Sequence, residues 1–448
     1  MSLAWERSEP LTTIEEDLQR RILDRSAVVG VVGLGYVGLP FAVEKGKVGY
    51  RVIGIEQNPQ RARKINRGEN YIGDVDDNDL RRLVQAGRLT AVGDFARVPE
   101  MDVIVVCVPT PLTRNLTPDL SYVESVTRAM APYLRPGQLV TLESTTYPGT
   151  TEEVMLPLLE SSGLRVEHDF FLAHSPERVD PGNQRYTTRN TTKVVGGVGP
   201  RSLQAAMTFY RQTIEQVVPV SSAKAAELTK VFENTFRAVN IALVNEMALL
   251  CDRLGLNVWE VLEAANTKPF GIMPFFPGPG VGGHCIPIDP HYLEWKAREV
   301  NFNTHFIALA GEINRKMPEF VRDKALRILN HQGTAPSRAR VLVLGVAYKK
   351  DIDDYRESPA IEVIRLLRAE GVEVEYHDPL VPEFREHGLH MRSVDLSAER
   401  LRSCDLVLVA TDHSAFDYPW VVAQARHVLD TRNATRGVSA GRERITLL

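Results

Sequence analysis

An apolar stretch at residues 27–32 runs directly into the glycine pattern GLGYVG at 33–38. A segment compatible with a helix, 39–47, and a second apolar stretch, 51–55, follow and end at Glu56. Strand, glycine turn, helix and strand in this order form the βαβ unit in which glycines let the backbone approach a pyrophosphate. An acidic residue about 20 positions beyond the glycines binds the ribose of NAD and repels the extra phosphate of NADP. The pattern predicts an NAD site, with a glycine turn lacking a ligand as the alternative.

Polar residues follow two further apolar stretches of this region, at 144–151 and 174–178. Ligands of open parallel sheets bind at the carboxyl ends of the strands, so Thr145 is expected to face a site. Thr150 or Thr151 is expected to cap a helix at 152–161. By itself, Glu177 is more typical of a solvated loop carboxylate. The predicted dinucleotide contacts of the βαβ unit are Gly33, Gly35, Tyr36, Val37, Gly38, Glu56 and Arg61.

Residues 221–254 contain neither glycine nor proline and predict one long helix, about 50 Å if unbroken. A helix of this length usually bridges domains or subunits, so a homodimer or a higher homo-oligomer is the expected assembly. Glu227, Lys230 and Asn234 share one face of the helix. Their spacing alone favours a solvated polar stripe. Helices are also expected at 258–266, 291–299, 304–315 and 318–330.

A loop rich in glycine and proline at 276–290 surrounds Cys285. This composition excludes a regular helix or a central strand and leaves the backbone open to close approach. We interpret Cys285 as a candidate nucleophile, with a structural cysteine in a tight turn as the alternative. His284, Asp289 and His291 could be imagined with Cys285 as zinc ligands, but the intervening prolines make that geometry doubtful.

A second α/β unit begins with the apolar stretch 340–344 and contains a lone Gly345 instead of a GxGxxG pattern. It therefore favours a mononucleotide or nucleotide sugar over a second dinucleotide. The expected fold class is α/β, with two Rossmann-like parallel-sheet domains joined by a helical middle domain. The predicted divisions are an N-terminal extension with a short helix (1–26), an NAD-binding domain (27–220), a helical central and dimerisation domain (221–330) and a nucleotide-sugar-binding domain (331–448).

Composition limits the class of protein and its compartment. A length of 448 residues suggests two or three domains, and a net charge of −4 gives no indication of a nucleic-acid partner. The four cysteines form no CxxC pair, so neither a zinc knuckle nor a disulfide framework is expected, and no metal site is predicted. The apolar run 27–43 is short for a membrane span and is interrupted by glycines. We expect no targeting or membrane segment, no membrane partner and a cytoplasmic location.

Seven motifs together resemble the UDP-glucose/GDP-mannose dehydrogenase family, from about Val28 to Leu429. They are GLGYVGLP (33–40), VPTPL (108–112), ESTTYPGTT (143–151), SPER (175–178), AELTKVFENTFRAVNIALVNE (226–246), GVGGHCIPID (280–289) and GVAYKKDIDDYRESPA (345–360). The order and spacing of the motifs carry this resemblance.

The resemblance implies oxidation of a nucleotide-sugar C6 alcohol to a carboxylate with two NAD. Lys230 and Asp289, through a water ordered by Thr145, would take the first proton, and Cys285 would pass through a thiohemiacetal and a thioester that Glu177 helps to hydrolyse. The implied catalytic residues are Cys285, Lys230, Asn234, Asp289, Glu177 and Thr145. Further implied cofactor contacts are Thr110, Thr145 and Arg356, and implied substrate contacts are Glu177, Arg178, Lys230, Asn234, Gly282 and Lys349.

Departures from the UDP-glucose pattern indicate which branch the chain resembles. Ile288 stands where UDP-glucose members usually carry lysine, and 268–272 lacks the arginine that reaches a neighbouring subunit's sugar. Arg178 and Val179 replace a hydrophobic pair, while Glu56 replaces the commoner aspartate without changing the expected NAD preference. These features resemble the UDP-N-acetylglucosamine 6-dehydrogenase branch, with UDP-glucose or dTDP-glucose left open.

Other classes of function remain as alternatives. A 3-hydroxyacid or 6-phosphogluconate-type dehydrogenase shares the Rossmann domain and long helix but needs no nucleophile, so Cys285 argues against it. A zinc alcohol dehydrogenase would need clustered ligands. An inactive nucleotide-sugar sensor or assembly partner is disfavoured by the retention of Lys230, Asn234, Cys285 and Asp289.

Overall fold

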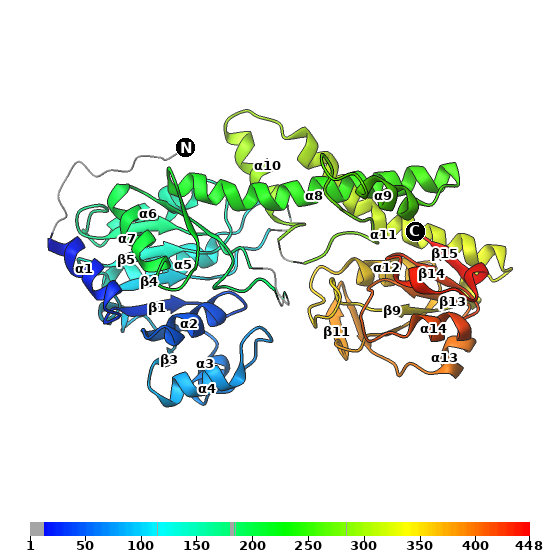
Figure 1. Ribbon diagram of the computed structural model, residues 1–448, viewed down its shortest axis with the longest axis horizontal. Helices are drawn as coiled ribbons and strands as arrows, with labels where there is room; N and C mark the ends of the chain where they lie inside the picture. The colour runs from blue at the N-terminus through cyan, green and yellow to red at the C-terminus, as the bar shows by residue number, and fades with distance from the viewer. Residues whose placement is uncertain (1–12, 114, 180–182, 184, 284) are drawn as a thin grey trace. The chain divides into compact units, whose positions relative to one another are not determined.

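The computed structural model describes residues 13–113, 115–179, 183, 185–283 and 285–448. The chain forms two compact units that meet in sequence at Phe232 and Glu233 (Figure 1). The first twelve residues of the expected N-terminal extension and His284 lie outside the described residues. Among the residues described, no helix is long and apolar enough to cross a membrane.

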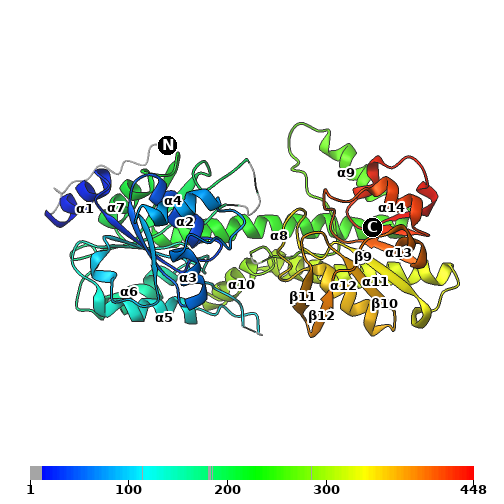
Figure 2. The same ribbon diagram turned by 90° about the horizontal axis from the view of Figure 1, so that it is seen from below.

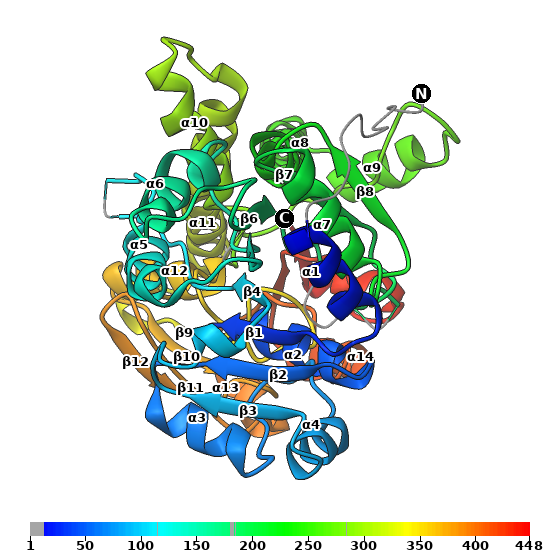
Figure 3. The same cartoon turned by 90° about the vertical axis from the view of Figure 1, so that its left-hand side faces the viewer.

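An eight-stranded sheet forms the centre of the first unit, in the order β3-β2-β1-β4-β5-β6-β7-β8. Its strands are β1 (Val28–Val32), β2 (Arg51–Ile55), β3 (Leu89–Val92), β4 (Val103–Val106), β5 (Leu139–Leu142), β6 (Phe171–His174), β7 (Lys193–Gly197) and β8 (Val217–Val220). Strands β3, β2, β1 and β4 lie side by side in Figure 3. Central strands such as β1 are buried along their whole length, which explains their continuous apolar sequences.

Helices cover both faces of this sheet. Core side chains from α1, α2, α3, α4 and α7 pack on one face, and those from α5 and α6 pack on the other. The helices are α1 (Thr13–Leu23), α2 (Gly38–Lys47), α3 (Pro59–Asn66), α4 (Asp77–Gln85), α5 (Ser121–Met130), α6 (Leu156–Glu160) and α7 (Pro200–Tyr210). A long helix, α8 (Ala223–Leu254), follows and confirms the glycine-free and proline-free prediction.

The second unit contains a five-stranded parallel sheet in the order β10-β9-β13-β14-β15 and a separate β11-β12 hairpin (Figure 2). The strands are β9 (Arg340–Leu344), β10 (Glu373–His377), β11 (Glu383–Glu386), β12 (Leu389–Arg392), β13 (Leu406–Val409), β14 (Val428–Asp430) and β15 (Ile445–Leu447). The helices after α8 are α9 (Val258–Asn266), α10 (Asp289–Glu299), α11 (His305–His331), α12 (Pro359–Ala369), α13 (Ala398–Ser403) and α14 (Tyr418–Gln424). Side chains of α11 and α12 pack on one face of the sheet and those of α13 and α14 on the other. The predicted α/β fold class with two Rossmann-like sheets and a long central helix is confirmed.

Three local predictions are wrong. The two helices expected at 304–315 and 318–330 are one helix, α11, with a buried Pro318 inside it. The ring of Pro318 lies beside Gly280, so packing offsets the hydrogen bond that the proline cannot donate.

The sheet of the first unit is not fully parallel, because β7 pairs with β6 in antiparallel register. The helical segment after residue 150 begins with a π-helical turn, Thr151–Met155, and has no side-chain cap from Thr150.

Candidate active site

The glycine turn after β1 forms a cradle of backbone. Gly33 has a φ of +89°, and a Cβ there would meet the carbonyl oxygen of Cys107 at 2.5 Å. A Cβ on Gly38, where α2 begins, would overlap the carbonyl oxygen of Gly33. An added Cβ on Gly35, in contrast, would meet nothing within 4 Å. Two glycines are therefore required by packing, and the third leaves open backbone at a helix N-terminus, where a pyrophosphate fits.

Glu56 lies at the carboxyl end of β2, as the NAD prediction requires. Its carboxylate accepts hydrogen bonds from the backbone N–H of Asn58 at 2.8 Å and of Leu34 at 3.2 Å. The guanidinium of Arg61 stacks on the ring of Tyr71 at 5.5 Å, and the Tyr71 hydroxyl donates to the carbonyl of Leu34. The acidic and basic groups at this edge are thus held against the glycine turn, and they fit the ribose and adenosine end of NAD.

Thr110 and Thr145 meet at the carboxyl ends of β4 and β5. The Thr110 hydroxyl donates to the carbonyl oxygen of Thr145 at 2.7 Å. Ser144 makes the parallel contact, donating from Oγ to the carbonyl of Val108 at 2.7 Å. The two predicted cofactor contacts are therefore joined, and the loop after β5 has a fixed path beside the glycine turn.

Glu227, on the first turns of α8, ties this loop to the helix. Its carboxylate accepts hydrogen bonds from the backbone N–H of Gly149 at 2.5 Å and from the N–H and hydroxyl of Thr151 at 2.8 and 2.6 Å. Glu227 is 1% exposed, and burial raises the pKa of its carboxyl to about 7. The solvated stripe predicted from spacing is therefore wrong for Glu227, and also for Asn234, which is 3% exposed. The carboxylate of Glu227, instead of a threonine hydroxyl, accepts from the first N–H group of the helical segment, that of Thr151.

Glu177 follows β6 and is held by charge and by backbone. One carboxylate oxygen accepts from the N–H of Arg178 and of Val179, each at 2.8 Å, and the other lies 3.6 Å from Nζ of Lys193. Burial would raise the pKa of this carboxyl, but the ammonium of Lys193, the two N–H groups and the ammonium of Lys230 hold it below its usual value. Glu177 is therefore a partly buried, ionised carboxylate and not the solvated loop residue that its sequence context alone favours. The Arg178 guanidinium is turned to the carbonyl of Thr192 at 2.7 Å.

In the second unit, Asn234 and Asp289 come together from positions 55 residues apart. Nδ2 of Asn234 donates to Oδ2 of Asp289 at 2.5 Å, and both residues are buried. Asp289 is the first residue of α10, and its N–H donates to the carbonyl oxygen of Cys285 at 2.8 Å. Cys285 itself is exposed. An accessible thiol thus lies one turn before a buried carboxylate that α8 holds in place.

The glycines of the Cys285 loop have a packing reason. A Cβ on Gly282 would meet the carbonyl oxygen of Glu357 and Cβ of Tyr348, each at 2.7 Å, and a Cβ on Gly283 would meet the Tyr348 ring at 2.9 Å. Gly280, with a φ of +137°, would meet Pro359 at 2.8 Å. The loop therefore lies directly against the segment between β9 and α12, which carries Lys349 and Arg356.

His291 does not join Cys285 as a ligand, because its ring contacts Glu294 at 3.2 Å and Arg315 at 3.4 Å.

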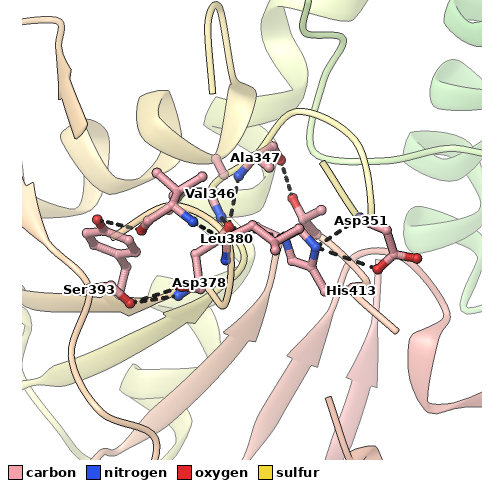
Figure 4. Close-up of polar contacts among 12 residues, drawn as sticks. Val346, Ala347, Asp351, Asp378, Leu380, Ser393 and His413 are labelled. Carbon is pink, nitrogen blue, oxygen red and sulfur yellow. Dashed lines mark hydrogen bonds and ion pairs between the residues drawn. The ribbon is translucent and has the colours of Figure 1, made fainter. Parts of the chain in front are cut away.

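Asp378 and His413 hold the segment between β9 and α12 in place (Figure 4). The Asp378 carboxylate accepts hydrogen bonds from Nε2 of His413 at 3.1 Å and from four backbone N–H groups, those of Val346, Ala347, Leu380 and Val381. Nδ1 of His413 in turn accepts from the N–H of Asp351 at 3.0 Å. The ring therefore joins the end of β10 to the loop on which Lys349 lies. Arg356, farther along this loop, forms a bidentate pair with Asp354 at 2.8 and 2.6 Å.

Three groups at these sites escaped the sequence analysis. Lys193 and Glu143 form a buried ion pair beside Glu177, and His413 supports the Lys349 loop. A lysine at the start of an apolar stretch gives no sign of its partners, which depend on strand pairing. The motif ESTT did contain Glu143, so the acidic residue inside an otherwise apolar strand end was an available signal.

The first unit carries a dinucleotide cradle and a strand-end loop with paired threonines. The second unit carries an exposed cysteine beside a buried aspartate. These features fit the class of NAD-linked dehydrogenases with a separate substrate-binding unit. Models of three domains of the UDP-glucose/GDP-mannose dehydrogenase family match the chain: the NAD binding domain at 27–214, the central domain at 224–316 and the UDP binding domain at 342–437. The chain belongs to the UDP-glucose/GDP-mannose dehydrogenase family and is an NAD-dependent nucleotide-sugar dehydrogenase, an oxidoreductase.

Curated relatives agree with this assignment. UDP-N-acetyl-D-mannosamine dehydrogenase of Pyrococcus horikoshii is 36% identical over 92% of this chain and 97% of its own length. UDP-N-acetyl-D-glucosamine 6-dehydrogenase of Pseudomonas aeruginosa is 35% identical over 87% of this chain and 91% of its own. The solved structure of the Pyrococcus horikoshii UDP-D-ManNAc dehydrogenase matches with a TM-score of 0.85 and 35% identity, covering 94% of this chain and 98% of that one.

Proposed function

We propose that this enzyme oxidises the C6 alcohol of a UDP-N-acetylhexosamine to the uronic acid in two successive NAD-dependent steps, through a thioester on Cys285. The hydrogen bond between Asn234 and Asp289, with Cys285 one turn away, is the observation that carries the proposal. UDP-N-acetylglucosamine is the first candidate sugar, because the residues around Cys285 and Glu177 depart from the UDP-glucose pattern. UDP-N-acetylmannosamine is the second, because it is the sugar named for a relative that is 36% identical over nearly its full length.

The first oxidation requires removal of the C6 hydroxyl proton. Asp289 and Lys230, with a water that Thr145 orders, take this proton. Asn234 donates from Nδ2 to Asp289 and, together with Lys230, stabilises negative charge on the C6 oxygen. Lys230 and Asn234 are one helical turn apart on α8, so a single rigid helix positions both. Bound NAD supplies the hydride acceptor in each oxidation.

The second oxidation uses the exposed thiol. The Cys285 sulfur attacks the aldehyde carbon to give a thiohemiacetal, whose oxidation leaves a thioester. Glu177, held as a carboxylate by its surroundings, removes a proton from the water that hydrolyses this thioester. In this account Cys285 needs thiolate character, and the family resemblance assigns the cation that supports it to Lys230.

The remaining predicted contacts divide between cofactor and substrate. The glycine turn, Glu56 and Arg61 bind NAD with Thr110, Thr145 and Arg356; for Arg356 this requires exchange of its present partner, Asp354. The substrate contacts are Glu177, Arg178, Lys230, Asn234, Gly282 and Lys349. We assign NAD binding to residues 27–220, the helical centre to 221–330 and nucleotide-sugar binding to 331–448, in a cytoplasmic enzyme.

We also propose that the enzyme is a homodimer. Within the second unit, α8 exposes Phe236, Leu243, Leu250 and Leu254, which are 41–61% exposed and recur at intervals of seven and four residues. The loop after α9 adds Phe270 and Met273, exposed by 70% and 60%. An apolar helix face of this kind is typical of a protein interface. Leu243→Glu is expected to shift the protein to a monomer in analytical ultracentrifugation, whereas a parental monomer would refute this assembly.

The test of the activity is a substrate panel. The enzyme is incubated with NAD and UDP-N-acetylglucosamine, UDP-N-acetylmannosamine, UDP-glucose or dTDP-glucose, and the product mass is measured. The proposal expects a uronic acid, 14 Da above the alcohol because two hydrogens are lost from the alcohol and the resulting aldehyde gains one oxygen, with a UDP-N-acetylhexosamine giving the highest kcat/KM. No product from any sugar would favour a nucleotide-sugar sensor, and preference for UDP-glucose or dTDP-glucose would overturn the N-acetylhexosamine assignment.

A further inference from the structure

The antiparallel strand β7 of the first unit positions the Lys193 ammonium beside Glu177. β7 pairs with β6 so that Ala173 faces Gly197 and His174 faces Gly196. Residues earlier in β7 therefore extend beyond the carboxyl end of β6, toward Glu177. Lys193, the first residue of β7, lies at this edge. A parallel β7 would place its first residue at the opposite edge of the sheet.

The Lys193 ammonium contacts two carboxylates and one backbone carbonyl. Its ammonium lies 2.7 Å from Oε2 of Glu143 and 3.6 Å from Oε2 of Glu177. It also lies 3.5 Å from the carbonyl oxygen of Pro176, the residue before Glu177. The Lys193 side chain is 5% exposed, so water screens these interactions little.

Glu143 fixes the position of this cation. Its side chain is fully buried at the end of β5, and its second oxygen accepts a hydrogen bond from the Tyr210 hydroxyl at 2.8 Å. Tyr210 is itself buried on α7. Of the two carboxylates that share Lys193, Glu177 is the one with access to solvent, at 16% exposure. Glu143 is therefore fixed in position, whereas Glu177 is the carboxylate that faces solvent.

We propose that Lys193 is a positioning residue that keeps Glu177 ionised and oriented for hydrolysis of the Cys285 thioester. This inference rests on the proposed role of Glu177. In that step the oxygen of water bonds to the thioester carbon, and the carbon–sulfur bond breaks with its electron pair leaving on the Cys285 sulfur. One water proton passes to Glu177, and the acid product loses the other to solvent.

The charges around Glu177 agree with this role. Apart from Lys193, the Lys230 ammonium from α8 and the N–H groups of the adjoining loop favour the Glu177 carboxylate over the acid, whereas the like charge of Glu143, which Lys193 offsets, opposes it. The pKa of Lys193 is raised, because its two carboxylates outweigh the effect of burial, so it stays charged. The other titratable groups near Lys193 are Cys107, His174, Tyr210 and Lys45.

The decisive variant is Lys193→Met combined with Glu143→Gln. The double change removes the cation from Glu177 without leaving Glu143 as an unpaired buried charge. Lys193→Arg serves as the conservative rescue. Lys324→Met combined with Asp252→Asn is the matched control, because it removes a comparable ion pair, 2.7 Å long, from the second unit. Glu177→Gln is the positive control for a block in hydrolysis.

The readouts are rapid-quench NADH formation, the mass of Cys285-containing peptides and the pH profile of the steady-state rate. The Lys193→Met/Glu143→Gln variant is expected to form two NADH per subunit in a burst, accumulate a sugar-nucleotide adduct on Cys285, and then turn over at least tenfold more slowly. The acid limb of its pH profile should move up by about one pH unit. Lys193→Arg should restore most of the rate, and the Lys324→Met/Asp252→Asn control should show no adduct.

Two results would overturn the inference in distinguishable ways. If Glu177→Gln accumulates the adduct and the Lys193→Met/Glu143→Gln variant does not, with an unshifted acid limb, Lys193 has only a structural role. If no variant, Glu177→Gln included, carries an adduct, the thioester route fails and the inference fails with it. Thermal melts of all variants identify any that do not fold. If the double variant does not fold, Lys193→Gln, which also removes the cation, provides the adduct and pH-profile measurements for the same decision.

Discussion

Nδ2 of Asn234 on the long helix α8 donates a hydrogen bond to Oδ2 of Asp289 at the start of α10. The two residues are 2–3% exposed and were placed in one site from sequence motifs that lie far apart in the chain. An amide that donates to a buried carboxylate fixes the orientation of both groups.

Replacing Asn234 by alanine is expected to lower kcat by about 10²- to 10³-fold, because a donor to a developing oxyanion and the support of Asp289 are both lost. Asn240→Ala, whose side chain lies on an exposed part of the same helix, is the control and should keep the parental kcat. Steady-state NADH formation with saturating substrates measures both. Equal rates for Asn234→Ala and the parent would remove Asn234 from the catalytic assignment.

The buried carboxyl of Glu227 is expected to make the free energy of unfolding depend on pH. Burial raises its carboxyl pKa from the ordinary 4.5 to about 7, so between these values the folded protein keeps a proton that the unfolded chain has lost. The contribution of Glu227 to the free energy of unfolding therefore falls as pH rises through this window, by at most about 1.4 kcal/mol per pH unit. Glu227→Gln should flatten this slope in urea unfolding between pH 5 and 7. Glu246→Gln, at an exposed position of α8, should keep the parental slope; parallel curves for Glu227→Gln and the parent would contradict the account.

Lys45 is expected to destabilise the fold near neutral pH. It is fully buried on α2, with its ammonium 3.3 Å from the carbonyl oxygen of Phe209 and 3.6 Å above that residue's ring. Burial lowers its pKa well below 10.5, so the unfolded chain binds a proton that the folded state has shed, and stability rises with pH up to the unfolded value. Lys45→Met should raise the free energy of unfolding at pH 7 by about 1–4 kcal/mol and flatten its rise toward pH 9. Lys47→Met, nearer the surface, should stay within about 0.5 kcal/mol of the parent, whereas a loss of stability in Lys45→Met would show that the buried ammonium is favourable.

His413 supports the Lys349 loop through one ring nitrogen and Asp378 through the other. A glutamine at 413 can still donate to Asp378 but has no atom at the Nδ1 position, and an asparagine can replace Nδ1 but not Nε2. We expect His413→Gln to raise KM for the nucleotide sugar by about 3- to 10-fold, the value of one hydrogen bond, and His413→Asn to raise it less. Equal KM values in both variants and the parent would show that the loop keeps its position without the ring.

The sequence predicted the regular elements well where local signals were strong. The bounds of β2, β9 and α9 agree with the expected segments, and α8 starts within two residues of its prediction, because apolar runs, glycines and the absence of breakers mark them. The antiparallel direction of β7 could not be predicted, because strand direction is decided by pairing with distant residues. The sequence also predicted a break between two helices before Pro318. The packing of Pro318 against Gly280, which lets one helix continue, is visible only in the folded protein.

The site was predicted to a similar extent. Motif residues such as Asn234, Asp289 and Cys285 were named together, and the structure brings them together within the second unit. Spacing along α8 showed that Glu227 and Asn234 share a face but not that this face is buried. The supporting groups Lys193, Glu143 and His413 act through partners that lie far away in the chain, so no local pattern marks them.

The proposed reaction oxidises one nucleotide sugar twice at a single site, with Cys285 as the nucleophile. The most direct test is to count the NADH formed per molecule of a limiting UDP-N-acetylhexosamine, with the parent enzyme and with Cys285→Ala. We expect two NADH per sugar for the parent, with uronic acid as product, and loss of this complete oxidation in Cys285→Ala. One NADH per sugar in the parent, or two in Cys285→Ala, would contradict it.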